Sequence, residues 1–96
     1  MDVLKIDQVF IRPIDSHERE RAIVRAMVDL ARGLSLRTVA EGVENIGSIA
    51  LLKTIGCGYA QGFGIQRPLP PDDLTAWLTG GGHGYRLASA QRNPTT

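Results

Sequence analysis

The sequence predicts an α/β protein built on a parallel β-sheet. Three short runs with strand character begin at residues 3, 36 and 59, and a longer segment with helical character follows each of them. This alternation of strand and helix is typical of successive βα units, in which each helix connects two parallel strands of one sheet.

Strands are expected over residues 3–7, 36–41 and 59–63, which are short runs rich in β-branched, apolar or aromatic residues. Pro13 interrupts the chain after the first run, because the residue before a proline avoids the helical conformation. Regular structure is therefore expected to break over residues 11–14.

The longest helix is expected between the first two strands. It is predicted to start at an acidic capping box of Asp15 and Glu18, or at Ser16, and to end at Gly33. Its buried face is predicted from apolar residues that recur at helical spacing, namely Ile23, Met27, Leu30 and Leu34.

Two shorter helices complete the pattern. One is expected between Asn45, as its N-terminal cap, and Gly56, where it stops. Pro71 suits the first position of the other, and the carboxylates of Asp72 and Asp73 favour its positive end. The apolar residues predicted to pack from these two helices are Ile49, Leu52, Ile55, Leu74, Trp77 and Leu78.

Composition excludes several classes of protein. The 96 residues carry a net charge of +1, so no basic field directs the chain to a nucleic-acid polymer or an anionic membrane. No apolar run reaches the roughly 18–20 residues that cross a bilayer, and the first residues do not resemble a signal peptide. A single cysteine, Cys57, excludes an internal disulfide and fits a reducing compartment. We therefore expect a cytoplasmic protein.

The domain organisation is predicted from the extent of these patterns. Residues 1–79 contain every strand and helix pattern and are expected to form the folded part. Residues 80–96 begin with a run of glycines and are predicted to be a flexible tail.

Polar side chains stand at the carboxyl ends of all three predicted strands. Lys5 and Asp7 are two residues apart and project to one face, Glu41 closes the second strand, and Gln61 lies in the third. Ligands of parallel α/β proteins bind at the carboxyl ends of strands, so these residues predict a site there. Ordinary structural roles remain open for each: a surface ion pair for the first two, a helix start for Glu41, and a hydrogen-bonded core amide for Gln61.

Zinc and thiol chemistry are not indicated. His17 and His83 have no cysteine or carboxylate at ligand spacing. Cys57 follows the end of a predicted helix and has no base beside it in the sequence, so a structural role is expected.

Four segments, taken in order, resemble the last three βα units of EAL domains. This family comprises bacterial phosphodiesterases that hydrolyse the second messenger cyclic di-GMP to the linear dinucleotide pGpG. The resemblance covers about residues 1–79 and departs from the family at Gln8 and Val9, where Arg and Ser are common. The matching segments are Leu-Lys-Ile-Asp at 4–7, Ala-Glu-Gly-Val-Glu at 40–44, Gly-Cys-Gly-Tyr-Ala-Gln-Gly at 56–62 and Arg-Pro at 67–68.

The resemblance implies a partial TIM-type (β/α) barrel that holds the last three strands and helices of an EAL barrel. It implies that Lys5, Glu41 and Gln61 are catalytic and that Lys5, Gln61 and Arg67 contact the substrate. It also implies that Glu41 and Asp7 are ligands of Mg²⁺ or Mn²⁺. The residue types suit these roles, because hard divalent cations prefer carboxylate oxygens and a lysine ammonium neutralises phosphate charge.

Other motifs of the family have no counterpart in the sequence. These are the Glu-Ala-Leu motif, the asparagine and glutamate that follow it, and the Asp-Asp-Phe-Gly loop. We therefore expect the chain alone to bind no metal and to be inactive, and to self-associate or to be completed by the missing part of a parent protein. The resemblance also implies a supporting position for Glu44. The alternative function is a non-catalytic regulatory or protein-interaction module derived from an EAL domain.

Overall fold

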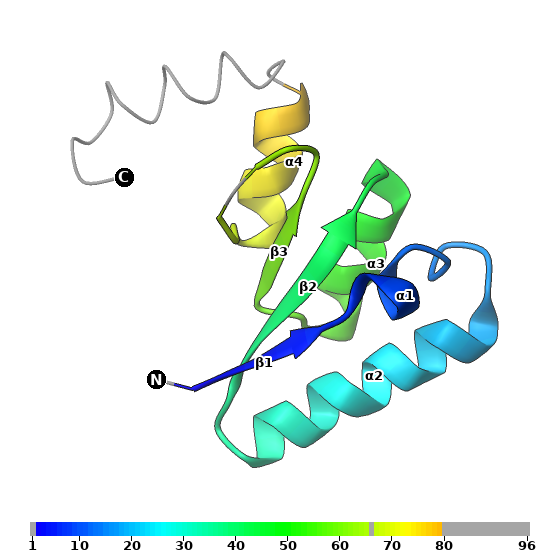
Figure 1. Ribbon diagram of the computed structural model, residues 1–96, viewed down its shortest axis with the longest axis vertical. Coiled ribbons are helices and arrows are strands. Elements are labelled where there is room, and N and C mark those ends of the chain that lie inside the picture. Colours follow the sequence, from blue (N-terminus) through cyan, green and yellow to red (C-terminus); the bar gives the residue numbers. More distant parts are fainter. Residues whose placement is uncertain (1, 66, 80–96) are drawn as a thin grey trace.

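The computed structural model describes residues 2–65 and 67–79. A parallel sheet has the strand order β1 (Val3–Ile6), β2 (Arg37–Val43) and β3 (Tyr59–Gly62). The helices are α1 (Gln8–Ile11), α2 (Glu18–Gly33), α3 (Ile46–Ile55) and α4 (Pro71–Thr79), as Figure 1 shows. The predicted α/β class with a parallel sheet is confirmed, whereas the predicted tail over residues 80–96 lies outside the described residues.

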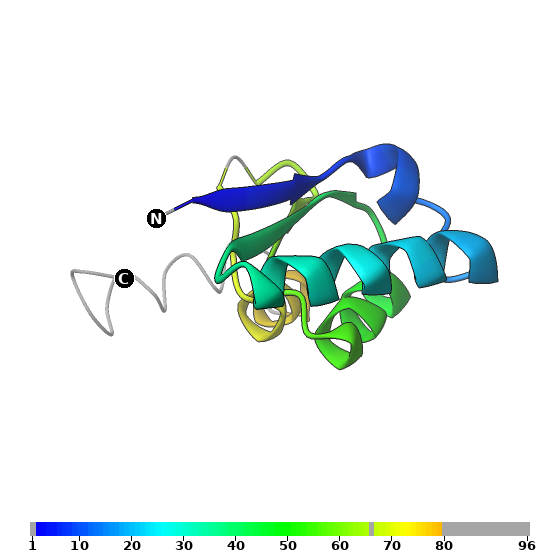
Figure 2. The same cartoon turned by 90° about the horizontal axis from the view of Figure 1, so that it is seen from below.

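The described part of the molecule has two layers. Helices α2, α3 and α4 lie together on one side of the sheet (Figure 2), and the core fills the space between them and the strands. Ile6, Ala40 and Ala60 point into this core from the three strands and are fully buried. Because successive strand residues point to opposite faces, the residues beside them face the other side, which no described helix covers.

Helix α2 ends at Gly33 as predicted, but it differs from its prediction at its start and on its buried face. Its N-cap is His17, which makes no capping hydrogen bond with its side chain, so the predicted caps at Asp15 and Ser16 are wrong. Gly33 is the last helical residue, and the left-handed conformation falls at Ser35 (φ 57°). The buried residues of the helix are Val24, Val28 and Ala31.

The predicted apolar stripe of α2 is therefore only partly buried. Ile23 and Met27 are half-buried, but Leu30 is 59% exposed and Leu34 is 60% exposed. The stripe that faces the sheet has nearly the same spacing as the predicted one and is rotated by about one residue, since both sets repeat every three or four positions.

Helices α3 and α4 form as predicted. The side chain of Asn45 accepts a hydrogen bond from the backbone N–H of Ser48 (2.7 Å), and Gly56 ends α3 in the left-handed conformation (φ 99°). Pro71 is the first residue of α4. The predicted packing residues Ile49, Leu52, Ile55 and Leu74 are buried, and Trp77 and Leu78 are half-buried.

Helix α1 was not predicted, because its four residues are too few to show a helical period. The side chain of Asp7 caps it by accepting a hydrogen bond from the backbone N–H of Val9 (2.9 Å), so β1 ends at Ile6 rather than at Asp7. Ile11 and Ile14 are fully buried, which anchors the segment around Pro13 against the core.

The outer edge of β3 is partly occupied by the chain that follows it. Ala60 and Leu69 form an isolated antiparallel bridge, in which each backbone N–H donates to the other residue's carbonyl (2.7 and 2.8 Å). The carbonyl of Gly62 accepts from the backbone N–H of Ile65 (3.0 Å).

Over the described ranges, no helix has the length and apolar character that a membrane crossing requires.

Candidate functional site at the carboxyl ends of the strands

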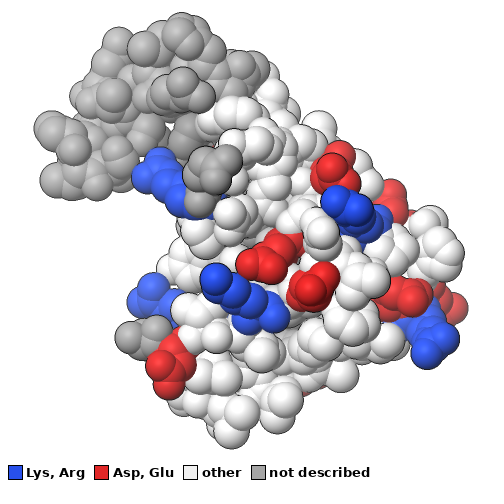
Figure 3. Space-filling model, in the orientation of Figure 1, with Lys and Arg blue, Asp and Glu red and all other residues white. Residues whose placement is uncertain are grey.

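The structure brings three of the predicted site residues onto the uncovered face of the sheet. Glu41 on β2 is paired in register with Gln61 on β3, and both are half-buried. Lys5 on β1 is exposed and pairs with Val39, two residues before Glu41 on the same face. Figure 3 looks onto this face and shows basic and acidic side chains beside one another near its centre.

Asp7 lies at the end of β1 but does not form the ion pair with Lys5 that the sequence left open. Its Oδ1 atom accepts the capping hydrogen bond from Val9, which leaves Oδ2 as a further acceptor. The ion pairs found in the described part of the chain are Arg12–Glu44, Asp29–Arg32 and Lys53–Asp72. Asp7 therefore fixes the start of α1 and still presents one carboxylate oxygen at the strand end.

A bulge in β2 follows Glu41 directly. The register with β3 shifts between Glu41 and Val43, and Gly42 adopts a left-handed conformation (φ 77°). A Cβ atom at position 42 would collide with the Cβ atom of Gln8, so only glycine fits this close approach of β2 to α1. Val43 then turns into the core and is fully buried, which holds the strand end in place.

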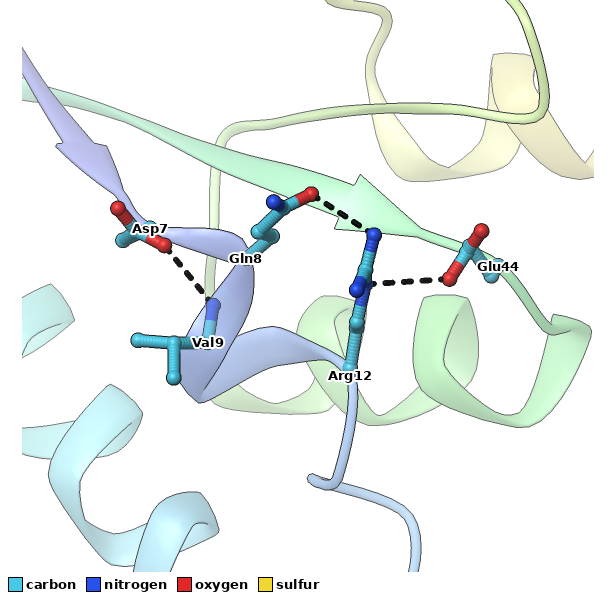
Figure 4. A network of polar contacts seen from close by, with 5 residues as sticks. All are labelled: Asp7, Gln8, Val9, Arg12 and Glu44. Carbon is cyan, nitrogen blue, oxygen red and sulfur yellow. Dashed lines mark hydrogen bonds and ion pairs between the residues drawn. The ribbon is translucent and has the colours of Figure 1, made fainter.

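A polar network links the ends of β1 and β2 (Figure 4). The Nε atom of Arg12 contacts Oε1 of Glu44 at 3.2 Å, and its Nη2 atom donates to Oε1 of Gln8 at 3.1 Å. Glu44 thus anchors the loop after β2 to the end of α1. Arg12 and Gln8 were not predicted as site residues, and their spacing of four residues is the local pattern that indicates their contact.

Arg37 and Tyr59 form a second missed feature, at the opposite end of the uncovered face. The Nη1 atom of Arg37 donates to the Tyr59 hydroxyl at 3.3 Å, and the guanidinium lies 5.8 Å from the centre of the ring. They help line a shallow cavity of about 270 Å³ with Val3, Val39 and Pro68. Alternate residues of a strand face the same side, so Arg37, four residues before Glu41, is expected on the same face of the sheet as Glu41.

Arg67 is the predicted site residue that the structure leaves apart. It is exposed, and within the described ranges its side chain has no hydrogen bond or ion pair to Lys5, Asp7, Glu41 or Gln61. Its neighbour at position 66 lies outside the described residues.

The carboxylates at the strand ends suit a hard cation in type but not in number. Asp7 and Glu41 offer the oxygen ligands that Mg²⁺ and Mn²⁺ prefer. Residues 2–65 and 67–79 contain no group of three or more His, Cys, Asp or Glu side chains placed to hold a metal ion. The described residues can therefore contribute ligands to a metal site, but they do not complete one.

Cys57 has the structural environment that the sequence predicts. It is buried, and its Sγ atom donates to the carbonyl of Tyr59 at 3.3 Å. Burial raises the pKa of the thiol above its ordinary value of 9.0, with hydrogen bonds to Thr38, Tyr59 and Ala40 opposing the shift. The thiol is therefore protonated at neutral pH and unreactive.

The family follows from a comparison with known domains. The sequence pattern described as "EAL domain" matches residues 1–68. The chain belongs to the EAL domain family. An uncharacterized signaling protein of Caulobacter vibrioides is 46% identical over 83 residues, which are 86% of this chain and 10% of that protein. Cyclic di-GMP phosphodiesterase NbdA of Pseudomonas aeruginosa is 40% identical over 90 residues, which are 94% of this chain and 11% of that protein.

Solved EAL structures share the fold of the described residues. The manganese and cyclic di-GMP complex of Klebsiella pneumoniae BlrP1 is 33% identical, with a TM-score of 0.64. The match covers 73% of this chain and 18% of that one. The chain thus spans about a tenth of the length of the curated relatives named above and matches part of the EAL structure.

Proposed function

We propose that this chain forms one side of the active site of a cyclic di-GMP phosphodiesterase, as the last three βα units of its barrel. The family reaction is metal-dependent hydrolysis of cyclic di-GMP to pGpG. The observation that carries the proposal is the direct pairing of Glu41 with Gln61 at adjacent strand ends, with Lys5 on the same face and Asp7 at the end of β1.

Each residue has a role that its chemistry supports. Lys5 is exposed, and its ammonium neutralises charge on the phosphate that is cleaved. The amide of Gln61 donates and accepts hydrogen bonds, so it orients the substrate and the attacking water beside Glu41. Arg67 offers a guanidinium to a phosphate of the substrate.

Glu41 and Asp7 are the proposed metal ligands on this side of the site. A pair of bound Mg²⁺ or Mn²⁺ ions would lower the pKa of a water molecule bound to them and would neutralise charge on the phosphoryl oxygens of the substrate. The oxygen of Asp7 that is free of the helix cap is the one available to such an ion. The network of Arg12, Gln8 and Glu44 links the two strand ends at the surface.

We propose further that the chain needs the rest of a barrel for turnover. Two carboxylates would leave most of the coordination shell of either cation to water, so the cation would be weakly held. A complete barrel has eight strands and about 250 residues, and the missing strands would carry the remaining ligands.

The test is a complementation assay. The purified chain is incubated with cyclic di-GMP and Mn²⁺, alone and with a separately produced barrel portion that carries the Glu-Ala-Leu and Asp-Asp-Phe-Gly segments, and pGpG is measured by chromatography. We expect turnover with both parts, loss of at least about 100-fold with Glu41→Gln, and no change with Glu18→Gln on the exposed start of α2.

The other outcomes separate the alternatives. Rapid turnover by the chain alone would refute the need for the rest of the barrel. Tight binding of cyclic di-GMP without turnover in either condition would favour the regulatory module. The absence of both binding and turnover with the two parts together would refute the proposed function.

A further inference from the structure

Helix α2 carries a second apolar stripe beside the one that it buries. The residues that face the sheet are Val24, Val28 and Ala31. The second stripe, which we call the α2 flank, comprises Ile23, Met27, Leu30 and the C-cap residue Leu34. A helix that packs against a single layer has one apolar stripe about 100° wide, and the two stripes of α2 together cover about twice that angle. The α2 flank therefore has the composition of a contact surface, although Leu30 and Leu34 are 59% and 60% exposed.

The α2 flank lies on the side of the molecule that β1 forms. Helix α2 connects β1 to β2 and runs opposite to the strands, with α3 on its other side. One residue advances a right-handed helix by about 100°, so the residue before each buried one faces away from α3. In both ribbon views α2 and β1 lie side by side (Figure 1, Figure 2). Helix α1 contacts α2, and its residue Val9 is a further apolar side chain that is 64% exposed.

The edge of β1 beside the α2 flank is open. The backbone N–H of Arg37 donates to the carbonyl of Asp2 (3.3 Å), so Asp2 faces β2, and the next residue, Val3, directs its N–H and C=O outward. Among the residues that the structure describes, none pairs with this side of β1. On the other edge strand, β3, the N–H and C=O of Ala60 are already bonded to Leu69. An added strand therefore finds free hydrogen-bonding groups at β1.

We propose that β1 and the α2 flank together bind the preceding βα unit of an EAL barrel. A parallel strand added to β1 continues the sheet, and the right-handed connection typical of such units puts its helix on the same side as α2. That helix lies about 8–10 Å from α2, which is close enough to cover Leu30 and Leu34. The inference rests on the part of the proposed function that makes this chain a portion of an EAL barrel, and not on the roles of the site residues.

The two parts of the surface favour a βα unit over simpler partners. A strand alone would pair with β1 but leave Leu30 and Leu34 in water, and a helix alone would leave the backbone groups of β1 unpaired. The chain matches only part of the EAL structure, 18% of the BlrP1 chain, so an EAL barrel has further βα units to place here. A second copy of this chain is the competing occupant, and the test separates the two.

Binding measured without catalysis tests the assignment. The full chain is titrated into the fluorescently labelled barrel portion of the complementation assay, with neither cyclic di-GMP nor Mn²⁺ present, and anisotropy gives the dissociation constant. Leu30→Ala and Leu34→Ala should each weaken binding about 5- to 20-fold, because each removes apolar surface that the partner buries. Val3→Pro removes an outward N–H of β1 without disturbing the pairing with β2, and should weaken binding at least about threefold.

The matched control is Ile46→Ala at the start of α3. Ile46 is also an exposed apolar residue (53%), but it lies on another helix, so the dissociation constant should stay within about twofold of the wild type. Circular dichroism checks that each variant is folded.

A second measurement covers the case in which the barrel portion does not fold alone. The two parts are joined in one polypeptide, and its urea unfolding is compared with that of the chain by itself. Leu30→Ala should lower the folding equilibrium constant about 5- to 20-fold in the joined polypeptide, but only about twofold or less in the chain alone. Equal effects in the two contexts would overturn the proposal.

The remaining outcomes separate this inference from the proposed function. Binding that depends on Leu30 and Leu34, without turnover once cyclic di-GMP and Mn²⁺ are added, would refute the proposed function and support the docking surface. Binding that is insensitive to both leucines would overturn the docking surface, even where turnover is seen. If the same substitutions weakened self-association of the chain while the barrel portion did not bind, the surface would belong to a second copy, which would also overturn the proposal.

Discussion

The bulge after Glu41 depends on the absence of a side chain at position 42, and Gly42→Ala is the perturbation that tests this. Alanine there must adopt a left-handed conformation, which costs about 1–2 kcal/mol. Its Cβ atom also collides with the Cβ atom of Gln8, and rotation of the Gln8 side chain does not move that atom. Overpacking of this kind costs about 1–3 kcal/mol.

The two contributions predict that Gly42→Ala lowers the free energy of unfolding by about 2–5 kcal/mol. Small domains are stable by about 5–15 kcal/mol, so the loss is large enough to measure by urea denaturation followed by circular dichroism. The matched control is Gly33→Ala at the end of α2. A Cβ atom at that position meets nothing within 4 Å, so the control should be neutral or stabilising by up to about 1 kcal/mol.

A second substitution separates the collision from the backbone strain. Gln8→Gly removes the Cβ atom that the new alanine meets, so it should recover about 1–3 kcal/mol in the Gly42→Ala background beyond its own effect. The same double variant remains measurable if Gly42→Ala alone does not fold. The reasoning is refuted if Gly42→Ala unfolds within about 0.5 kcal/mol of the wild type, or if the two substitutions are additive.

Three further outcomes are expected. Arg12→Leu should lower the free energy of unfolding by less than about 1 kcal/mol, with a smaller effect at high salt, because the side chains of Arg12 and Glu44 are 55% and 64% exposed; urea titrations at low and high salt check this. Val28→Ala should cost about 1–3 kcal/mol and Leu30→Ala less than about 0.5 kcal/mol in the same assay; the reverse order would show that the predicted stripe of α2 is the buried one. The raised pKa of Cys57 keeps its thiol protonated in the folded state at pH values where the thiol of the unfolded chain ionises, so the contribution of Cys57 to stability should decline as pH rises above about 9. The difference in free energy of unfolding between the wild type and Cys57→Ala, measured at about pH 7 and pH 10, checks this. A difference that grows with pH would contradict it.

Local sequence features predicted the boundaries that depend on local contacts. Asn45 starts α3 by accepting a hydrogen bond from Ser48, and Gly56 ends the helix in the left-handed conformation. The residues involved are at most four positions apart. Pro71 starts α4 because its ring fixes the backbone and its missing N–H is not needed there. Such features are not always sufficient, because the capping box predicted at Asp15 and Glu18 does not form at the start of α2.

The buried face of α2 could not be chosen from local features. Ile23, Met27 and Leu30 have the same helical spacing as Val24, Val28 and Ala31, and the first set is the more hydrophobic. The choice between them depends on where the helix lies on the sheet. In the structure the smaller residues face the strands, and Leu30 is left in solvent.

The candidate site divides in a similar way. Lys5, Glu41 and Gln61 share a face because strand residues alternate, so their placement follows from the sequence once the strands are known. The link from Arg12 to Glu44 joins segments separated by a whole βα unit, and only the fold brings them together. Arg67 follows a residue outside the described ranges, so its predicted contact with substrate stays a prediction.

The two edge strands of the sheet, β1 and β3, differ in a way that limits the growth of edge-to-edge polymers of this chain. On β3, the bridge to Leu69 and the turn to Ile65 consume hydrogen-bonding groups that an incoming chain would need. No comparable bridge to β1 is found among the described residues. Amyloid-like stacking needs two open strand edges on every molecule, because each added chain pairs through one edge and offers the other to the next chain. A chain with one border blocked terminates such a stack after a single addition, which disfavours fibres.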